Sequence, residues 1–89
     1  MRAVISVIGQ DRVGILAMTA NACADHNINI LEVAQTILDN VFSMTMLVDM
    51  DSMDVPFDLF AAQMEELGLA NELVIRVMNE QIFQAMHSI

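Results

Sequence analysis

The sequence predicts an α+β fold of the ferredoxin-like type: a four-stranded antiparallel sheet with two helices on one face, followed by a short C-terminal helix. Two observations predict it. Short apolar, β-branched runs alternate with runs of helical periodicity in the order strand, helix, strand, strand, helix, strand. The two middle strands are separated only by the turn signal Asp39-Asn40, so they form a hairpin. No linker or low-complexity tract interrupts the chain, and we expect one domain spanning residues 1–89.

The first strand–helix unit occupies residues 2–26. Residues 2–8 are apolar and β-branched and are bounded by Gly9, which is typical of a buried strand. Residues 14–26 repeat apolar side chains at helical spacing. Asn27 follows where a left-handed cap is needed, a conformation that Asn tolerates better than most residues.

The hairpin joins residues 29–39 to residues 42–50 as antiparallel partners. In the second run the alternation is clear, with Leu47 as the exception. One face of it carries apolar side chains only, namely Phe42, Met44, Met46, Val48 and Met50. The first run, if it lies at the sheet edge as in ferredoxin-like order, carries only Glu32 and Asp39 as charges. An edge of that kind invites pairing with a second sheet.

The second helix begins near Pro56, which a helix tolerates in its first turn. Its buried stripe is expected to consist of Phe60, Met64 and Leu67, which recur at helical spacing. Gly68 is expected to end it.

A fourth strand is expected at residues 71–78, and a short terminal helix is expected at residues 80–89. The tail carries Ile82, Met86 and Ile89 at i, i+4 and i+7, which is the spacing of one helix face.

The face of the predicted sheet that is turned away from the two helices is too apolar to stand in water alone. Its apolar side chains are Val4, Ile8, Leu47 and Val74. Either the terminal helix or a second subunit should cover it.

Composition restricts the partners. Twelve acidic and three basic residues give a net charge of −9, which repels phosphate backbones and anionic membrane surfaces, so we expect no direct nucleic-acid or membrane binding. No apolar run approaches the ~20 residues that span a bilayer. Hydrophobic residues make up 56% of the chain, which is more than a domain of this size can bury by itself. We therefore expect a homodimer or higher oligomer. The single cysteine, Cys23, rules out an internal disulfide and fits a cytoplasmic location.

The residue pattern gives little support to a metal site or to catalysis. His26 and His87 do not stand at metal-ligand spacing from Cys23, and the acidic run 49–54 lacks the glycine and terminal glutamate of a calcium loop. No nucleophile lies beside a recognisable base, and the chain has no lysine. We therefore expect no metal, no cofactor and no enzyme activity. An acylphosphatase-like site using Arg12 is the enzyme alternative on the same fold, but the residues around it do not match.

The most informative segment joins the first strand to the first helix. It contains Gly9 and Gly14, two of the three glycines, and Arg12, one of the three basic residues. Such a turn can place helix N-terminal amides, the Asp11 carboxylate and a guanidinium around one small polar ligand. The alternative interpretations are close helix–strand packing at Gly14, an N-cap role for Asp11 and a solvated Arg12.

This segment, Asp11-Arg12-Val13-Gly14-Ile15-Leu16, together with Asn29-Ile30 at the start of the next strand, resembles the ACT domain. The resemblance covers essentially the whole chain. In particular, the chain resembles the stand-alone single ACT-domain proteins of bacteria and archaea, a family without an established function that is similar to the glycine cleavage system transcriptional repressor. ACT domains are small ligand-sensing modules, typically attached to enzymes of amino-acid metabolism.

The resemblance implies an amino-acid site shared between two subunits. Gly14 matches the glycine that opens the first helix, Asp11 the polar residue three positions before it, and Asn29 the asparagine at the start of the second strand. In ACT domains, side-by-side pairing brings that asparagine near the glycine turn of another subunit. This chain departs at Val13, where a proline is common, and at Asp11, which is charged where many binders carry a neutral amide and so favours an ammonium group. The candidate ligand-binding residues are Gln10, Asp11, Arg12, Val13, Gly14, Ile15, Asn29 and Ile30.

We therefore expect a regulatory module that binds a small molecule, an amino acid, at a subunit interface and acts through a protein partner. The alternative is a ligand-free homo-oligomerisation or protein-interaction module, in which Asn29 bonds its own backbone at the strand entry.

Overall fold

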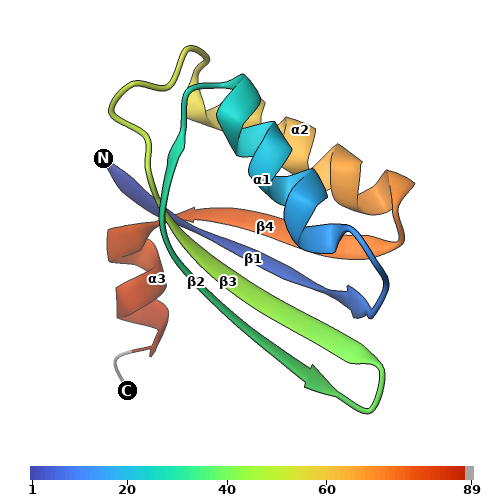
Figure 1. The fold of residues 1–89 in the computed structure, drawn as a ribbon. Helices are drawn as coiled ribbons and strands as arrows, with labels where there is room; N and C mark the ends of the chain where they lie inside the picture. The colour runs from blue at the N-terminus through green and yellow to red at the C-terminus, as the bar shows by residue number, and fades with distance from the viewer. Residues whose placement is uncertain (88–89) are drawn as a thin grey trace.

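The computed structural model describes residues 1–87 and shows a four-stranded antiparallel sheet with two helices on one face and a third helix on the other (Figure 1). Its elements are, in chain order, β1 (Arg2–Gln10), α1 (Ile15–Asp25), β2 (Asn29–Leu38), β3 (Val41–Asp49), α2 (Phe57–Ala70), β4 (Leu73–Asn79) and α3 (Glu80–His87). The strands lie side by side in the order β2-β3-β1-β4. The predicted ferredoxin-like fold is confirmed, and so is the edge position of β2.

Strand β1 lies at the centre of the sheet and fixes its register. Ile5 of β1 lies opposite Met46 of β3 on one side and Val77 of β4 on the other. Because directly opposite residues of paired strands point to the same face, these three side chains all face the helices. A register shift between Ile30 and Glu32 interrupts the pairing of β2 with β3.

The hydrophobic core lies between this face and helices α1 and α2. Phe60 and Met64 of α2, Ile15 and Cys23 of α1, and Met46 of β3 are all at most 1% exposed. The apolar alternation of β3 is confirmed, because each of the five residues predicted to share its inner face is buried. The buried residues of α1 recur at four-residue intervals, as one face of an amphipathic helix requires.

The turns follow the sequence signals. Asn27 adopts the left-handed conformation, with φ 61°, as predicted. Asp39 and Asn40 have φ 48° and 70°, as in the type I′ turn that suits a tight hairpin.

The prediction that Gly68 ends the second helix is wrong. Helix α2 continues to Ala70, and the side-chain amide of Asn71 donates to the carbonyl of Leu67 at 2.8 Å to close its last turn. Gly68 is buried, and a Cβ at its position would lie 2.7 Å from the carbonyl oxygen of Leu73. Glycine is therefore needed because α2 lies directly against the start of β4.

Helix α3 covers part of the second sheet face, which is the face turned away from α1 and α2. Arg2 and Glu80 form an ion pair of 2.7 Å at the start of α3, and Val4 is 5% exposed. Ile8 and Val74 remain 47% and 53% exposed. Ile89, the third residue of the apolar spacing that predicted this helix, lies outside the described residues.

Gly68→Ala is expected to lower the free energy of unfolding by about 1–3 kcal/mol, because the new methyl group meets backbone that cannot rotate away. Helix propensity alone predicts a gain of up to about 1 kcal/mol from the same change. The matched control is Gln63→Ala, at an exposed site on the same helix, with an expected change within about 0.5 kcal/mol. Urea unfolding measures both. A Gly68→Ala protein as stable as the wild type would contradict this account of the α2–β4 contact.

Burial raises the pKa of the Cys23 thiol from 9.0 to about 11. The unfolded thiol ionises near pH 9 while the folded one keeps its proton, so its contribution to stability is complete below pH 9 and is lost as the pH rises towards 11. The chain has no lysine and no tyrosine, which leaves Cys23 and the N-terminal amine as the groups that titrate there.

Cys23→Ala should therefore lose less stability than the wild type between pH 9 and pH 11, by about 2 kcal/mol, each protein being compared with itself at pH 7. Urea unfolding across this range measures the difference, and the N-terminal amine is common to both proteins. Equal losses in the two proteins would show that the Cys23 thiol is not protected by burial.

Candidate functional site

The β1–α1 turn lies at the end of the sheet where the β2–β3 hairpin also turns. Asp11, Arg12, Val13 and Gly14 are all exposed. The backbone N–H of Asp11 donates to the carbonyl of Asn40 at 2.8 Å, which ties this turn to the hairpin. Two loops that are far apart in the sequence are therefore held together.

Gly14 is required by the backbone conformation rather than by packing. Its φ is 95°, in the left-handed region that residues with a Cβ rarely adopt, and apart from the glycine and its two chain neighbours no described atom lies within 4 Å of the position of a Cβ. The interpretation that Gly14 allows close helix–strand packing is thus wrong. The N-cap interpretation of Asp11 is also wrong, because Gly14 occupies the cap position of α1.

The N-terminus of α1 is open to an anion. Within residues 1–87 no side chain bonds to its cap, and its first turn contains no acidic residue, whereas the first turn of α2 contains Asp58. The first amides of a helix have no partner within the helix, and the helix dipole places partial positive charge there. A carboxylate is the kind of group that such amides bind.

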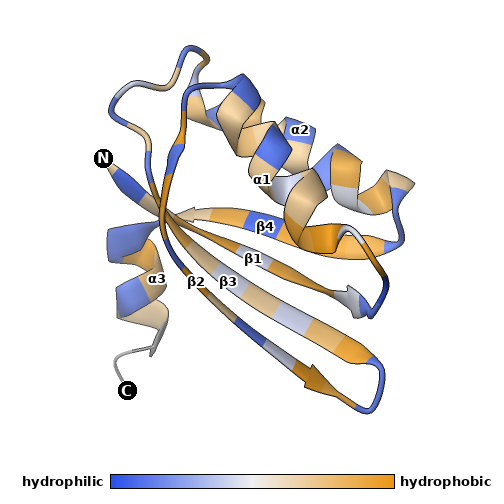
Figure 2. Cartoon of the chain, in the orientation of Figure 1, coloured by the Kyte–Doolittle hydropathy of each residue, from blue (hydrophilic) through white to orange (hydrophobic). Residues whose placement is uncertain are grey.

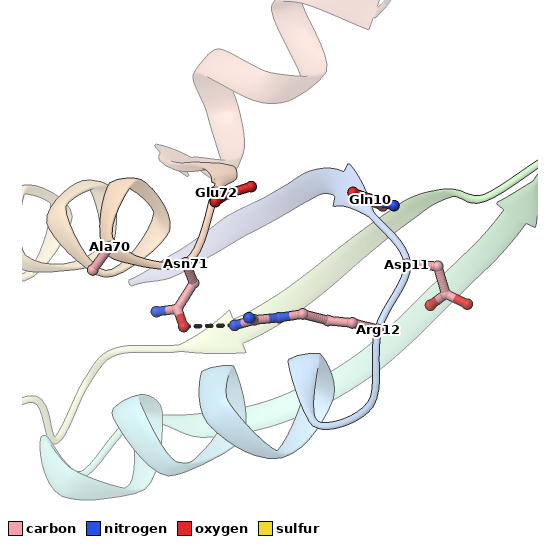
Figure 3. A pocket seen from close by; sticks show the side chains of 6 residues that line it. All are labelled: Gln10, Asp11, Arg12, Ala70, Asn71 and Glu72. Atoms are coloured by element: carbon pink, nitrogen blue, oxygen red, sulfur yellow. Dashed lines mark hydrogen bonds between the residues drawn. The ribbon is translucent and has the colours of Figure 1, made fainter.

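The two charged side chains of the turn diverge (Figure 3). Arg12 extends towards the end of α2, where its Nη2 donates to Oδ1 of Asn71 at 2.5 Å. Asp11 points away from this pair. The predicted grouping of the two side chains around one ligand is therefore not seen within a single chain, and the Arg12 guanidinium is engaged with an amide rather than free in solvent.

A hollow of about 270 Å³ lies between this turn and the connection from α2 to β4. It is lined by Gln10, Asp11, Arg12, Ala70, Asn71 and Glu72. The sequence did not predict Ala70, Asn71 and Glu72 as part of this site. The signal was present in the topology, because a central β1 paired antiparallel to β4 places Leu73 opposite Gly9 and so brings the end of α2 beside the end of β1.

Asn29 and Ile30 lie at the opposite end of the sheet from the β1–α1 turn. Asn29 is paired with Asp49, which in turn lies opposite Arg2 at the start of β1. The structure therefore brings together residues 10–15 and separates them from Asn29 by the length of β2. A site that contains both groups needs two chains.

Two further polar residues, His26 and Asp49, make contacts that explain them structurally. Nδ1 of His26 lies 2.9 Å from Oδ1 of Asp54, and its ring meets Phe60 edge-on at 5.9 Å between centroids. Asp49 accepts a hydrogen bond from the backbone N–H of Asp51, as in a polar turn. Among residues 1–87 no three His, Cys, Asp or Glu side chains are grouped so that they could hold a metal ion. None of the described helices has the length and apolar character needed to cross a bilayer.

Comparison with known proteins agrees with this arrangement. The sequence profile of the ACT domain matches residues 2–77. The UPF0237 protein of Methanocaldococcus jannaschii is 44% identical over 88 residues, which cover 99% of this chain and 98% of that protein. The ACT domain protein from Streptococcus pneumoniae has a TM-score of 0.82 and 31% identity, and the match covers 94% of each chain.

A putative glycine cleavage system transcriptional repressor shares the fold, with a TM-score of 0.69, 20% identity and coverage of 85% of this chain and 43% of that one. The UPF0237 relatives come from both archaea and bacteria. The chain belongs to the ACT domain family, whose members are generally small-molecule-binding regulatory domains.

Proposed function

We propose that the chain is a small-molecule-sensing regulatory module that binds an amino acid between two copies of itself. The observation that carries this proposal is the open N-terminus of α1 behind Gly14. It combines first-turn amides that no side chain of residues 1–87 caps, a left-handed glycine with free space beside it, and no acidic residue in the first turn of the helix, in a chain of net charge −9.

The chemistry of the turn suits a zwitterion. The α-carboxylate of an amino acid would accept hydrogen bonds from the first amides of α1, and the Asp11 carboxylate would accept from its ammonium group. Asp11 is exposed on the side of the turn that faces away from Arg12. The hydrogen bond from Arg12 to Asn71 keeps the guanidinium off the ligand in this arrangement. A ligand with a second carboxylate beside Asp11 would be repelled.

The second half of the site would come from the partner subunit through the α1–β2 side of the molecule. Helix α1 carries no charged residue before Asp25, whereas α2 carries several on its exposed face. All residues of β2 except Ile30 are exposed, and the hairpin is largely apolar near its hydrophilic turn (Figure 2). Val33 and Ile37 of this edge are 40% and 57% exposed. An unpaired apolar edge favours pairing with a second sheet.

Antiparallel pairing of two β2 strands would complete the site. It would place the Asn29 end of one strand beside the Leu38 end of the other. The β1–α1 turn is tied to that second end through the hydrogen bond from Asp11 to Asn40. Asn29 and Ile30 of the partner subunit would thus approach the turn, and ligand binding would stabilise the dimer. We assign the regulatory effect of ligand binding to a protein partner, because the net charge of −9 disfavours direct binding to nucleic acid.

A ligand-free interaction module is the second candidate, and the same weakly charged α1–β2 side favours it. The two candidates differ in whether Asp11 and Asn29 bind a ligand or only form part of the surface between subunits.

Thermal unfolding of the full chain with each of the twenty amino acids tests the proposal. A ligand at about 100 times its Kd stabilises the folded state by about 2.7 kcal/mol, which raises the Tm of a domain of this size by roughly 10 °C or more. Asp11→Ala and Asn29→Ala should abolish the increase. The control Asp25→Ala, at an exposed carboxylate near the other end of α1, should keep it. If no amino acid raises the Tm, and both site variants remain dimeric, the interaction module is the correct function.

Ile37→Lys is expected to weaken association through the β2 edge by at least about tenfold in Kd, because a charge on an edge strand opposes strand pairing. Sedimentation equilibrium measures the change. Leu69→Lys is the matched control, since it adds the same charge at a side chain that is 80% exposed at the end of α2, and it should leave the mass unchanged. Equal effects of the two variants would show that net charge, rather than the β2 edge, controls assembly.

A further inference from the structure

The sheet face that is turned away from α1 and α2 is covered at one end only. Helix α3 lies over the end where β1 begins (Figure 1), with Val4 5% exposed and the Arg2–Glu80 ion pair at its first turn. At the other end of the same face, Ile8 is 47% exposed and Val74 is 53% exposed. The half of this face that α3 covers is therefore raised, and the half around Ile8 and Val74 is bare.

This face carries few charges for a strongly acidic protein. Alternation along the strands places Arg2, Glu32 and Asp49 on it, and α3 adds Glu80, which pairs with Arg2. Arg76 also belongs to this face by alternation, but its guanidinium lies 3.7 Å from the Glu65 carboxylate of α2. The face thus holds only three of the twelve acidic residues. Two copies of a chain with net charge −9 repel one another, and the repulsion is smallest where the charge is lowest.

A hollow of about 270 Å³ lies on this face beside α3. On the adjacent strands β1 and β3 it is lined by the small side chains of Ser6, Ser43 and Thr45 together with Val4 and Ile8, and Met78 and Phe83 complete the lining. Small residues on a sheet allow another side chain or helix to approach closely. The lining contains no charged group, so an apolar side chain can enter without burying an unpaired charge.

Helix α3 presents two apolar side chains of suitable size. Ile82 and Met86 stand one turn apart and are 56% and 58% exposed. We infer that this face binds a second copy of the chain by a two-fold axis, so that Ile82 and Met86 of each copy lie over the bare half of the other, near the hollow. Rotation by the two-fold places the raised half of one copy on the bare half of its partner, which is the self-complementarity that an isologous interface requires.

This interface is separate from the β2 edge and does not depend on the proposed amino-acid site. The edge lies in the plane of the sheet, whereas this contact stacks two sheets with α3 between them. If both surfaces are used, the assembly is a dimer of dimers.

The mass of the full chain, measured by sedimentation velocity and light scattering, tests this inference. Ile82→Glu and Ser43→Arg should each halve the wild-type mass while the circular dichroism spectrum is retained. Leu69→Glu and Ser52→Arg place the same changes at exposed sites outside this face and should leave the mass unchanged. A wild-type protein that has the mass of one subunit, or face variants that keep the wild-type mass, would overturn the inference. The second result would leave the face to a different occupant.

Cross-linking tests the contact directly. A mixture of the Ile82→Cys and Ser43→Cys proteins should form a covalent dimer on mild oxidation, because the two positions meet across the two-fold. The native Cys23 is buried and should not compete. A mixture of Ile82→Cys with Ser52→Cys is the control. A yield no greater than that of the control would contradict the proposed contact even if the masses change.

Discussion

The central position of β1, between β3 and β4, is the constraint on which the rest of this structure depends. Its pairing on both sides sets which residues face the helices, and it brings the ends of β1, α2 and the hairpin to one side of the molecule. Gly9 is opposite Leu73 in this pairing, and a Cβ there would lie 3.2 Å from the carbonyl of Glu72. Gly9 and Gly68 together allow the start of β4 to lie close to its neighbours, and the candidate site is built at that end.

The surface divides into regions of different charge, and this division connects the fold to its assembly. Helix α1 and the β2 edge form one weakly charged region, and the second sheet face forms another, while most of the acidic residues lie on α2 and the connecting turns. Two copies of a chain with net charge −9 associate most readily where that charge is lowest. The two weakly charged regions are therefore the surfaces on which both proposals rest.

The fold was predictable from the sequence because each of its signals is local. The alternation of β3, the left-handed Asn27 and the Asp39-Asn40 turn each act within a few residues, and each was confirmed. Gly68 was misinterpreted because its neighbour, the Leu73 carbonyl, is brought to it by tertiary structure rather than by helix geometry. The candidate site was only half predictable for the same reason. Arg12 meets Asn71 across 59 positions of sequence, a contact that follows from sheet topology and leaves no local pattern.

The central claim is that the first amides of α1 bind a carboxylate with help from Asp11 and from Asn29 of a second copy. A ¹⁵N-labelled NMR titration of the full chain with the stabilising amino acid tests it most directly, because each amide reports separately. If a carboxylate binds there, the amide signals of Asp11, of residues 15–17, and of Asn29 and Ile30 shift, all with one affinity. Shifts confined to residues 70–72, or to the second sheet face, with residues 15–17 unmoved, would contradict it.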